Sequence, residues 1–556
     1  MRGIATLAVR LNQTMTQQLP PVICYNPATG QEIGRIPQAT TQDVANAYRE
    51  LREANSLWSN LSVKERIKIL RKMQYELVDS VEEITTVINK DTGKSRQDAL
   101  IELYITLDNL KLTLNNANKW LARQKLPSGT YVAKTCYVER RPFGTVAIVS
   151  PWNYPFMLAM QPALTALAAG NTVILKPSEV TGMTGKLIAK LFQRVPELAP
   201  FVRVLHGDGR VGAAIVDAQP DLIYLTGSTR TGKLIAKAAA EHLIPTIFEL
   251  GGKDPMIVLE DADLDAAAKW GIWGATTNAG QACTSVERTY VVDAVYDQFV
   301  EKVVEQARLL RIGYSDEVKD MNHYGPLSSE RQAQIVDVHI QDAIDKGAKM
   351  LTGSERQNLM MQPTILVDVE PSMKVLQEET FGPVMPIIRV KDETDAIERA
   401  NNSEFGLSAY IWGKTNRVKQ LMPQLEAGTV VANDVVAHFA VPTLPFGGLK
   451  KSGNGRSHGQ LDLLQFTQSQ SFMVSSPPSA LDIATRLREP GNYRLAEAVL
   501  KAQFGANVQQ KLTSADVVLN SYKVRTFLNQ TSEMVSSAAT GVSNSISSLL
   551  NRDKSQ

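Results

Sequence analysis

A glutamate and a cysteine are the two residues of this 556-residue chain whose types and surroundings could do chemistry together. Glu249 ends the apolar run Thr246-Ile-Phe-Glu249, and Leu-Gly-Gly-Lys253 follows it. Cys283 lies downstream in Asn278-Ala-Gly-Gln-Ala-Cys-Thr-Ser285, a small and turn-rich setting. A thiolate nucleophile needs open space and N–H groups that hold its charge, and a carboxylate beside it can activate water. The two stretches therefore predict covalent catalysis by a thiol.

Both residues also have a plainer interpretation. A lone cysteine is most often a buried apolar side chain, although Gly280 and Ala282 leave space around Cys283. We interpret Thr284-Ser-Val-Glu287 as a helix start whose N–H groups would favour the thiolate. Glu249 ends a predicted sheet strand. Because a buried, unpaired carboxylate is costly, a purely structural role for it is disfavoured.

These stretches resemble the aldehyde dehydrogenase superfamily, and the resemblance covers roughly Val22 to Phe472. It implies that Cys283 attacks the aldehyde carbon to form a thiohemiacetal, and that Glu249 activates water to hydrolyse the thioester. Asn153, in Pro151-Trp-Asn-Tyr-Pro155, would form the oxyanion hole with the Cys283 backbone N–H, although such an asparagine is also an ordinary turn residue. Relatives that transfer the acyl group to coenzyme A typically lack this glutamate, so a free acid is the expected product.

The resemblance also implies a dinucleotide cofactor, NAD, with NADP as the alternative. Lys176 and Glu179, in Lys176-Pro-Ser-Glu179, match residues that hydrogen-bond the adenosine ribose. A carboxylate on the ribose hydroxyls disfavours a 2′-phosphate, which favours NAD. Thr226-Gly-Ser-Thr-Arg-Thr-Gly232 matches a loop at which a helix N-terminus faces the pyrophosphate, although the chain has no convincing G-x-G-x-x-G after a strand.

A second cofactor element is Glu379-Thr-Phe-Gly-Pro383, which resembles the family segment that holds the nicotinamide ribose and contacts the ring. We assign these roles to Glu379 and Phe381, because Glu378 stands one position too far from Phe381. The complete set expected to bind the cofactor is Trp152, Lys176, Ser178, Glu179, Gly227, Ser228, Gly232, Leu250, Glu379 and Phe381.

Two positions depart from the family pattern. Ala282 precedes the expected nucleophile, where many relatives have a second cysteine or a bulkier apolar residue. Ser457 follows Gly455-Arg456, where the family usually has glutamate. The second change affects the local ion pairing rather than the expected chemistry.

The expected substrate is an apolar aldehyde of the fatty, apocarotenoid or aromatic class. By resemblance, Met157, Gln161 and Phe446 line the substrate tunnel. The segment from Gly428 to Leu449 contains no arginine or lysine, which the carboxylate of a semialdehyde would need as a partner. A plain hydrophobic core explains the apolar residues there equally well. The alternatives are a semialdehyde dehydrogenase, such as the succinate-semialdehyde type, and a weakly active binding protein on the same scaffold.

The composition excludes other classes. With 59 basic and 57 acidic residues the net charge is +2, which provides no case for a nucleic-acid partner. Cys24, Cys136 and Cys283 are an odd and sparse set, so we expect a reducing, cytoplasmic location rather than a disulfide framework. No metal site is expected. A cysteine–histidine hydrolase is disfavoured because the six histidines lie outside the motif stretches.

The elements that must position these residues follow an α/β pattern. Between Gly144 and Glu249, short apolar strands alternate with helical patterns, which predicts a parallel sheet covered by helices. Ligands bind such sheets at the carboxyl ends of the strands. A second α/β region follows, and before both lie long helical patterns such as Val63 to Asn89. Tyr131 to Glu139 and Leu464 to Phe472 are expected to be strands.

The chain is too long for one compact core, so several domains are expected. We expect a Rossmann-like parallel-sheet NAD-binding domain, a second α/β catalytic domain and a small β oligomerisation arm that makes the protein a homodimer or homotetramer. Their predicted limits are residues 20–120 with 141–251, residues 252–450, and residues 121–140 with 460–473, respectively.

Both ends of the chain extend beyond the resemblance. Residues 476–556 contain amphipathic patches at Arg494 to Phe504 and at Ala515 to Leu528, whereas Met534 to Asn551 is too polar to span a bilayer. We expect a flexible or loosely helical tail, with a peripheral membrane contact by an amphipathic helix as the alternative. For residues 1–14, an unstructured leader or an upstream start is favoured over a transit peptide.

Overall fold

The computed structural model describes residues 19–129, 134–353, 356–476 and 490–520. The expectations for residues 1–14 and 534–551 therefore lie outside the described residues. The chain separates into two compact units. The larger unit comprises the described residues up to Arg123 together with Glu139–Gln470, and the smaller comprises Gln124–Val138 and the described residues from Ser471 onward. The domain limits expected from the sequence remain a prediction.

The first large sheet has five parallel strands in the order β7-β6-β5-β8-β9. Its strands are β5 (Thr145–Val149), β6 (Thr172–Lys176), β7 (Val202–Val204), β8 (Leu222–Thr226) and β9 (Thr246–Glu249). The chain proceeds outward from β5 first to one edge and then to the other, so the direction of winding reverses between β5 and β8. Loops diverge at such a reversal and leave space for a ligand at the carboxyl ends.

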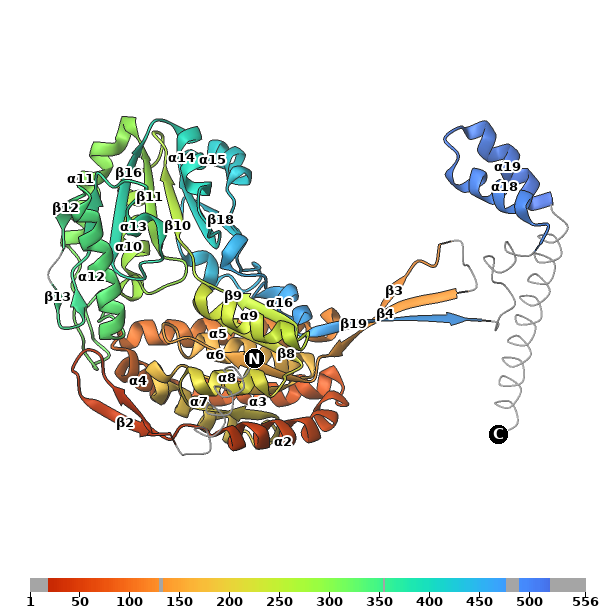
Figure 1. Cartoon of the computed structure of the whole chain (residues 1–556), viewed down its shortest axis with the longest axis horizontal. Helices are drawn as coiled ribbons and strands as arrows, with labels where there is room; N and C mark the ends of the chain where they lie inside the picture. Colours follow the sequence, from red (N-terminus) through yellow and green to blue (C-terminus); the bar gives the residue numbers. More distant parts are fainter. Residues whose placement is uncertain (1–18, 130–133, 354–355, 477–489, 521–556) are drawn as a thin grey trace, which may run out of the picture. The chain divides into compact units, whose positions relative to one another are not determined.

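Helices cover both faces of this sheet, which lies in the lower half of Figure 1. Alternate strand residues point to opposite faces, and accordingly Val146 and Ile148 belong to one core cluster and Ala147 to another. The first cluster includes residues of α3 (Val63–Asp79), α4 (Val81–Thr92), α5 (Arg96–Trp120), α6 (Met157–Ala169) and α7 (Gly182–Gln193). The second includes residues of α2 (Thr41–Ser59), α8 (Gly209–Asp217) and α9 (Thr229–Glu241).

The second large sheet has seven strands in the order β12-β15-β16-β11-β10-β17-β18, all parallel to their neighbours except β12. The strands are β10 (Asp254–Val258), β11 (Val286–Val292), β12 (Lys349–Thr352), β15 (Thr364–Val367), β16 (Val384–Val390), β17 (Ser408–Trp412) and β18 (Thr429–Ala432). The central strands are buried throughout, as expected for strands covered on both faces.

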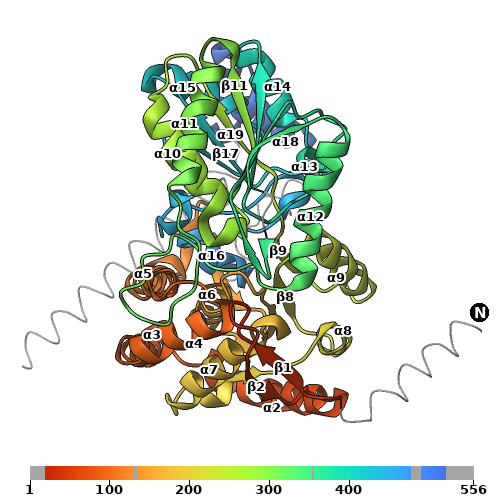
Figure 2. The same cartoon turned by 90° about the vertical axis from the view of Figure 1, so that its left-hand side faces the viewer.

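Helices also cover both faces of the second sheet, and Figure 2 shows them on both sides of β11. Residues of α10 (Leu264–Thr276) and α11 (Tyr296–Arg308) share one core cluster with the strands. The opposite cluster includes residues of α12 (Glu330–Asp345), α13 (Lys374–Gln377), α14 (Glu393–Asn401) and α15 (Thr415–Leu421).

Smaller elements complete the described chain. The hairpins β1 (Val22–Tyr25) with β2 (Glu32–Ile36) and β13 (Arg356–Gln357) with β14 (Met360–Met361) are antiparallel. A three-stranded sheet has the order β19-β4-β3, formed by β3 (Gln124–Leu126), β4 (Lys134–Pro142) and β19 (Thr467–Ser475). The remaining helices are α16 (Gly459–Gln465), α18 (Tyr493–Phe504) and α19 (Val508–Asn520). None of the described helices is long and apolar enough to span a bilayer.

Two expectations from the sequence pattern are wrong in detail, and a third lies partly outside the described residues. The pattern from Val63 to Asn89 forms two helices, because Ser80 leaves the helical conformation between α3 and α4. Leu464 still belongs to helix α16, so the last strand begins only at Thr467. The strand expected from Tyr131 is described only from Lys134 onward, since residues 130–133 lie outside the described part.

Candidate active site

Four strands of the five-stranded sheet end side by side, and the predicted site residues are at or just beyond these ends. In the register of the sheet, Val149 of β5 pairs with Lys176 of β6 and with Leu225 of β8. Thr226 of β8 pairs with Glu249 of β9. As the strand pattern predicts, the carboxyl ends of these strands lead into the segments that contain the predicted site residues Asn153, Lys176, Gly227 and Glu249.

Glu249 is the last residue of β9, and its side chain is buried, with 6% of its surface exposed. Its Oε1 atom has no hydrogen-bond partner among the described residues. Burial raises the pKa of the carboxyl to about 7, because the low-dielectric surroundings disfavour the charged form. The thiol of Cys283 lies within hydrogen-bonding reach of this carboxylate. The structure thus brings together the two residues from which the sequence argument began.

The turn before Cys283 has an unusual backbone. Asn278, Ala279 and Gly280 are consecutive residues with left-handed φ angles of 52°, 58° and 73°. Such a conformation is unfavourable for residues other than glycine. A Cβ atom at Gly280 would lie 2.1 Å from the carbonyl oxygen of Gly382, so only glycine fits there. The hydroxyl of Ser285 closes the turn by donating to the carbonyl of Gly280 at 3.1 Å.

The helix start expected after Cys283 is wrong, because the chain continues into strand β11 from Val286. Thr284 is instead held through its carbonyl, which accepts a 2.6 Å hydrogen bond from the hydroxyl of Tyr410. The local environment also does not favour the thiolate. Desolvation, followed by the charge of Glu249, raises the pKa of the half-buried Cys283 well above its usual value. The thiol is consequently neutral at neutral pH and requires a base.

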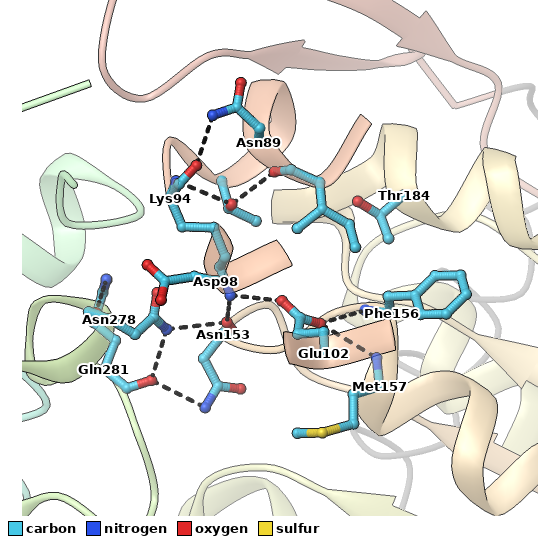
Figure 3. Close-up of polar contacts among 12 residues, drawn as sticks. Asn89, Lys94, Asp98, Glu102, Asn153, Phe156, Met157, Thr184, Asn278 and Gln281 are labelled. Carbon is cyan, nitrogen blue, oxygen red and sulfur yellow. Dashed lines mark hydrogen bonds and ion pairs between the residues drawn. The ribbon is translucent and has the colours of Figure 1, made fainter. Parts of the chain in front are cut away.

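Asn153 lies in the loop between β5 and α6, next to the turn that precedes Cys283 (Figure 3). Its side-chain amide donates to the carbonyl of Gln281 at 3.2 Å. Its own carbonyl accepts hydrogen bonds from Asn278 at 3.0 Å and from the ammonium of Lys94 at 2.8 Å. Gln281 is two residues before Cys283, so the side-chain amide of Asn153 lies close to the Cys283 backbone and is placed to donate a hydrogen bond there.

A buried ion pair holds this loop in place, and Figure 3 shows its contacts. The ammonium of Lys94 lies 2.6 Å from the carboxylate of Glu102 in α5, with 2% and 1% of the two side chains exposed. The second carboxylate oxygen of Glu102 accepts from the backbone N–H groups of Phe156 and Met157. These N–H groups begin α6 and have no acceptor inside the helix. The pair therefore fixes both Asn153 and the start of α6.

The dinucleotide residues expected at β6 and β8 lie at the strand ends. Lys176 is 4% exposed, and its ammonium donates to the carbonyls of Pro177 and Gly207 and lies 3.5 Å from the carboxylate of Glu179. Ser178 accepts from the N–H of Val180. At β8, Ser228 caps α9 by accepting the N–H of Thr231. The start of α9 therefore lies just beyond the carboxyl end of β8, where a helix N-terminus can bind an anion.

The segment with Glu379 and Phe381 is held by a second buried ion pair. Glu287 of β11 is bonded to the ammonium of Lys253, and its carboxylate accepts the backbone N–H groups of Thr380 and Phe381. Glu379 accepts the N–H of Gly252 at 3.1 Å. Burial, followed by the charge of Glu287, raises the pKa of Glu379 to about 8.

The aromatic rings expected around the nicotinamide are in contact. The rings of Trp152 and Phe381 meet edge to face with their centroids 5.5 Å apart. Glu378, the residue not chosen for the ribose, exposes 61% of its side chain and lies 3.7 Å from His339. Leu250 packs closely on Gly232, where a Cβ atom would lie 2.9 Å from the leucine methyl groups.

An apolar wall adjoins Glu249. Leu158, Gln161 and Phe439 line a pocket that also contains Glu249. A small apolar cluster beside it consists of Ile105, Met157 and Leu158, with Tyr154 and Phe439 packed against it. Phe446 is buried and meets Phe439 edge to face at 4.8 Å. The three expected tunnel residues therefore lie in or beside one apolar region of the protein.

A family model described as the aldehyde dehydrogenase family matches residues 14–472. The chain belongs to the aldehyde dehydrogenase family. It is therefore an oxidoreductase that acts on the aldehyde group with NAD or NADP, and both the resemblance and the α/β fold class expected from the sequence are confirmed.

Named relatives within the aldehyde dehydrogenase family differ in substrate. A Methylomonas sp. protein named 4,4'-diapolycopene aldehyde oxidase is 39% identical over 85% of this chain and 88% of its own. A Mycolicibacterium smegmatis protein named as a putative NADP(+) succinate-semialdehyde dehydrogenase is 37% identical over 80% of this chain and 87% of its own. The crystal structure of NADP-dependent glyceraldehyde-3-phosphate dehydrogenase from Bacillus halodurans C-125 with NADP has a TM-score of 0.77 and 34% identity, covering 83% of this chain and 96% of its own.

Sequence reasoning about this aldehyde dehydrogenase missed the residues that support the site. Lys94 and Glu102 lie far from every motif and gave no signal. Glu287 and its neighbour Arg288 could have drawn attention, because two charged residues inside a buried strand need buried partners. Lys253, the partner of Glu287, ends the stretch that contains Glu249.

Proposed function

We propose that this aldehyde dehydrogenase oxidises an apolar aldehyde to the free acid through covalent intermediates on Cys283. The observation that carries the proposal is the buried carboxylate of Glu249 beside a neutral thiol, with one carboxylate oxygen that no described residue pairs. A carboxyl with a pKa of about 7 exchanges protons readily near neutral pH.

In the first half-reaction, Glu249 takes the proton of the Cys283 thiol, and the sulfur attacks the aldehyde carbon. The carbonyl oxygen becomes an oxyanion that accepts hydrogen bonds from the Asn153 side-chain amide and the Cys283 backbone N–H. Preorganised donors of this kind are each worth about 3 kcal/mol of barrier. The turn at Asn278 and the ion pair of Lys94 support this arrangement, because both hold Asn153 next to the thiol loop.

The residues at the strand ends fit a dinucleotide. The carboxylates of Glu179 and Glu379 accept ribose hydroxyls, the start of α9 at Gly227, Ser228 and Gly232 suits the pyrophosphate, and Trp152 with Phe381 suits the ring. A bound nicotinamide supplies the acceptor for the hydride that leaves the thiohemiacetal carbon. The remaining residues of the proposed cofactor site are Lys176, Ser178 and Leu250. The carboxylate of Glu179 favours NAD over NADP.

In the second half-reaction, Glu249 deprotonates a water molecule that attacks the thioester carbon. The carbon–sulfur bond breaks, the departing thiolate of Cys283 takes the proton from Glu249, and the free acid leaves. Asn153 and the Cys283 N–H again hold the oxyanion. A histidine base is not needed, because the groups that act most strongly on the thiol are the carboxylates of Glu249, Asp254 and Glu379.

An apolar substrate is supported by two independent observations. Met157, Leu158 and Phe439 form an apolar wall beside Glu249, and residues 428–449 contain no lysine or arginine for a substrate carboxylate. The similarity to the Methylomonas protein named for an apocarotenoid aldehyde supports the same class. Relatives named as semialdehyde dehydrogenases are also similar to this chain. The carboxylate of a semialdehyde, however, would find no cationic partner in residues 428–449.

The central test is Cys283→Ala with a reactive short aldehyde. We expect formation of reduced dinucleotide to fall to the background rate, because no covalent intermediate can form. Circular dichroism and thermal unfolding should match those of the native protein. Native turnover in the variant would refute the proposed nucleophile.

The substrate class is tested separately with aldehydes of graded length, each with NAD and with NADP. We expect kcat/KM to rise with chain length and to be higher for decanal than for succinic semialdehyde, since only the former is desolvated at low cost in an apolar pocket. We expect NAD to be preferred. A higher kcat/KM for succinic semialdehyde would overturn the apolar-substrate proposal and leave the chemistry of Cys283 intact.

We also propose that the protein is a cytoplasmic homodimer or homotetramer and that its C-terminal tail contacts membranes. The free state of Cys24, Cys136 and Cys283 supports a reducing compartment. The edge strands β19 and β3 of the three-stranded sheet offer backbone groups to another subunit. Light scattering after size exclusion gives the number of subunits, and a monomer at micromolar concentration would contradict the oligomer proposal.

A further inference from the structure

One pocket of the larger unit contains two carboxylates that the mechanism above does not connect. The volume that the centre of a water molecule can occupy in it is about 10 Å³, which is room for about one water molecule. Glu249 forms one part of its wall and Asp462 of α16 another. The remaining lining residues are Leu158, Gln161, Pro162, Tyr224, Thr226, Phe439 and Ser457.

Buried polar atoms without protein partners indicate that this pocket holds water. Oε1 of Glu249 and Oγ1 of Thr226 both line it, and neither has a hydrogen-bond partner among the described residues. Both ring nitrogens of His458, next to Ser457, are likewise unpaired in the described part of the chain. Buried polar groups are rarely left unsatisfied, and ordered water is the usual partner where space exists.

Asp462 is a buried carboxylate without a cationic partner in the described residues. Its Oδ2 accepts from the hydroxyl of Thr165 at 3.1 Å, and its Oδ1 accepts from the amide of Gln465 at 3.0 Å. The hydroxyls of Tyr224 and Ser457 are 2.9 Å apart along the same pocket. These neutral partners hold Asp462 in place but do not explain why a carboxyl is buried there.

The proposed function creates a need for a second carboxylate. Oxidation of an aldehyde to a carboxylate releases two protons per turnover. One is the thiol proton that Glu249 takes in the first half-reaction, and the other is lost by the product acid. The proton that Glu249 later takes from water returns to the sulfur of Cys283. The burst of the first half-reaction uses the carboxylate already present. Before water can be activated, however, the buried Glu249 must lose the proton that it took from the thiol.

We propose that Asp462 accepts protons from Glu249 through water in this pocket, and that it determines how fast the second half-reaction proceeds. This inference rests on the proposed function. In each transfer, an O–H bond of the Glu249 carboxyl breaks, water relays the proton past Thr226, Tyr224 and Ser457, and an O–H bond forms on Asp462. Asp462 then releases the proton to solvent, which restores both carboxylates.

The electrostatic surroundings suit such a transfer. Burial raises the pKa of Asp462 to about 7, close to that of Glu249, so moving a proton between them costs little free energy. From the elements packed on α16, α6 presents the neutral Thr165 and β8 presents Tyr224. The buried carboxyl of α5, Glu102, is paired with Lys94. Burial lowers the pKa of the adjacent His458 to about 4, so it is neutral.

The test is stopped-flow measurement of reduced dinucleotide with Asp462→Asn at a pH at which Glu249 is ionised. We expect the burst rate and amplitude to equal those of the native enzyme. We expect the steady-state rate to fall about tenfold, less than the roughly 100-fold typical of losing a general base itself. The matched control is Asp217→Asn, the same change at an exposed position of α8, which should alter neither phase.

A second variant tests the pH dependence of the steady-state rate, which would not change if Asp462 had only a structural role. Thr165→Val removes a hydrogen bond that lowers the pKa of Asp462. The acidic limb of the steady-state pH profile should therefore shift to higher pH while the burst is unchanged. An unchanged steady state in Asp462→Asn, an equal loss of burst and steady state, or an unshifted limb in Thr165→Val would each overturn the inference. None of these results touches the proposed function, which fails only if Cys283→Ala retains turnover.

Discussion

The carboxylate of Glu249 and the thiol of Cys283 determine each other's protonation. Burial raises the pKa of Glu249 to about 7, and burial together with the Glu249 charge raises the pKa of Cys283 well above its usual value. At neutral pH the thiol is therefore protonated while much of Glu249 is ionised. This order makes the carboxylate a base toward the thiol, and it predicts a steady-state rate that increases with pH through about 7 and is lost below it.

Glu249→Gln separates the two effects of this carboxylate. We expect kcat to fall about 100-fold or more, because the base is lost. We also expect the pH dependence of Cys283 alkylation by iodoacetamide to shift to lower pH, because a negative charge that disfavours the thiolate is removed. Glu241→Gln, at the exposed end of α9, is the control. If alkylation keeps its native pH dependence, the two groups do not interact as described.

Among the elements, α5 and the loop before α6 illustrate how the fold supports the site. Neither α5 nor the turn before it contains a motif that identifies it, yet Glu102 of α5 and Lys94 of that turn hold the first N–H groups of α6 and the backbone of Asn153. A buried ion pair of this kind contributes little net stability but is costly to break, because removal of one partner leaves a buried charge.

Lys94→Met should therefore lower the free energy of unfolding by about 3–5 kcal/mol and reduce kcat through misplacement of Asn153. The matched change is Lys72→Met, which breaks the exposed pair with Glu197 and should leave both stability and kcat close to native. Urea denaturation and steady-state kinetics measure the two quantities. Equal losses in both variants would show that burial of the Lys94 pair has no special effect.

On the scale of the whole molecule, the proposed catalytic and cofactor residues all belong to the larger unit, whereas the described tail helices belong to the smaller one. Helices α18 and α19 expose large apolar side chains, among them Tyr493, Phe504 and Val508, with 78%, 70% and 71% of their surfaces accessible. Apolar residues exposed on neighbouring helices are typical of a surface that contacts lipid or protein.

Truncation after Ser476 tests the role of this tail. We expect kcat/KM for a short, water-soluble aldehyde to stay native, because the site residues are retained. Turnover of decanal presented in anionic vesicles should fall, together with cosedimentation of the protein with those vesicles. If the truncated protein still cosediments to the native extent, the tail does not provide the membrane contact.

The sequence alone determined the fold class, the family and the residue types of the chemistry. Glu249, Cys283 and the loop at Gly227 are recognisable because each depends on a short stretch of chain, where strand patterns and glycines are local signals. The carboxyl ends of the strands in the first sheet could also be predicted, because they too follow from local patterns in the sequence.

Only the tertiary structure decided how these residues are held and how they titrate. It replaced the helix start expected after Cys283 with a strand, and it reversed the expected effect on the thiol pKa. It also paired Lys94 with Glu102 and placed Asp462 in the pocket of Glu249. Desolvation and ion pairing depend on residues far apart in the chain that folding brings into contact, and no local pattern records them.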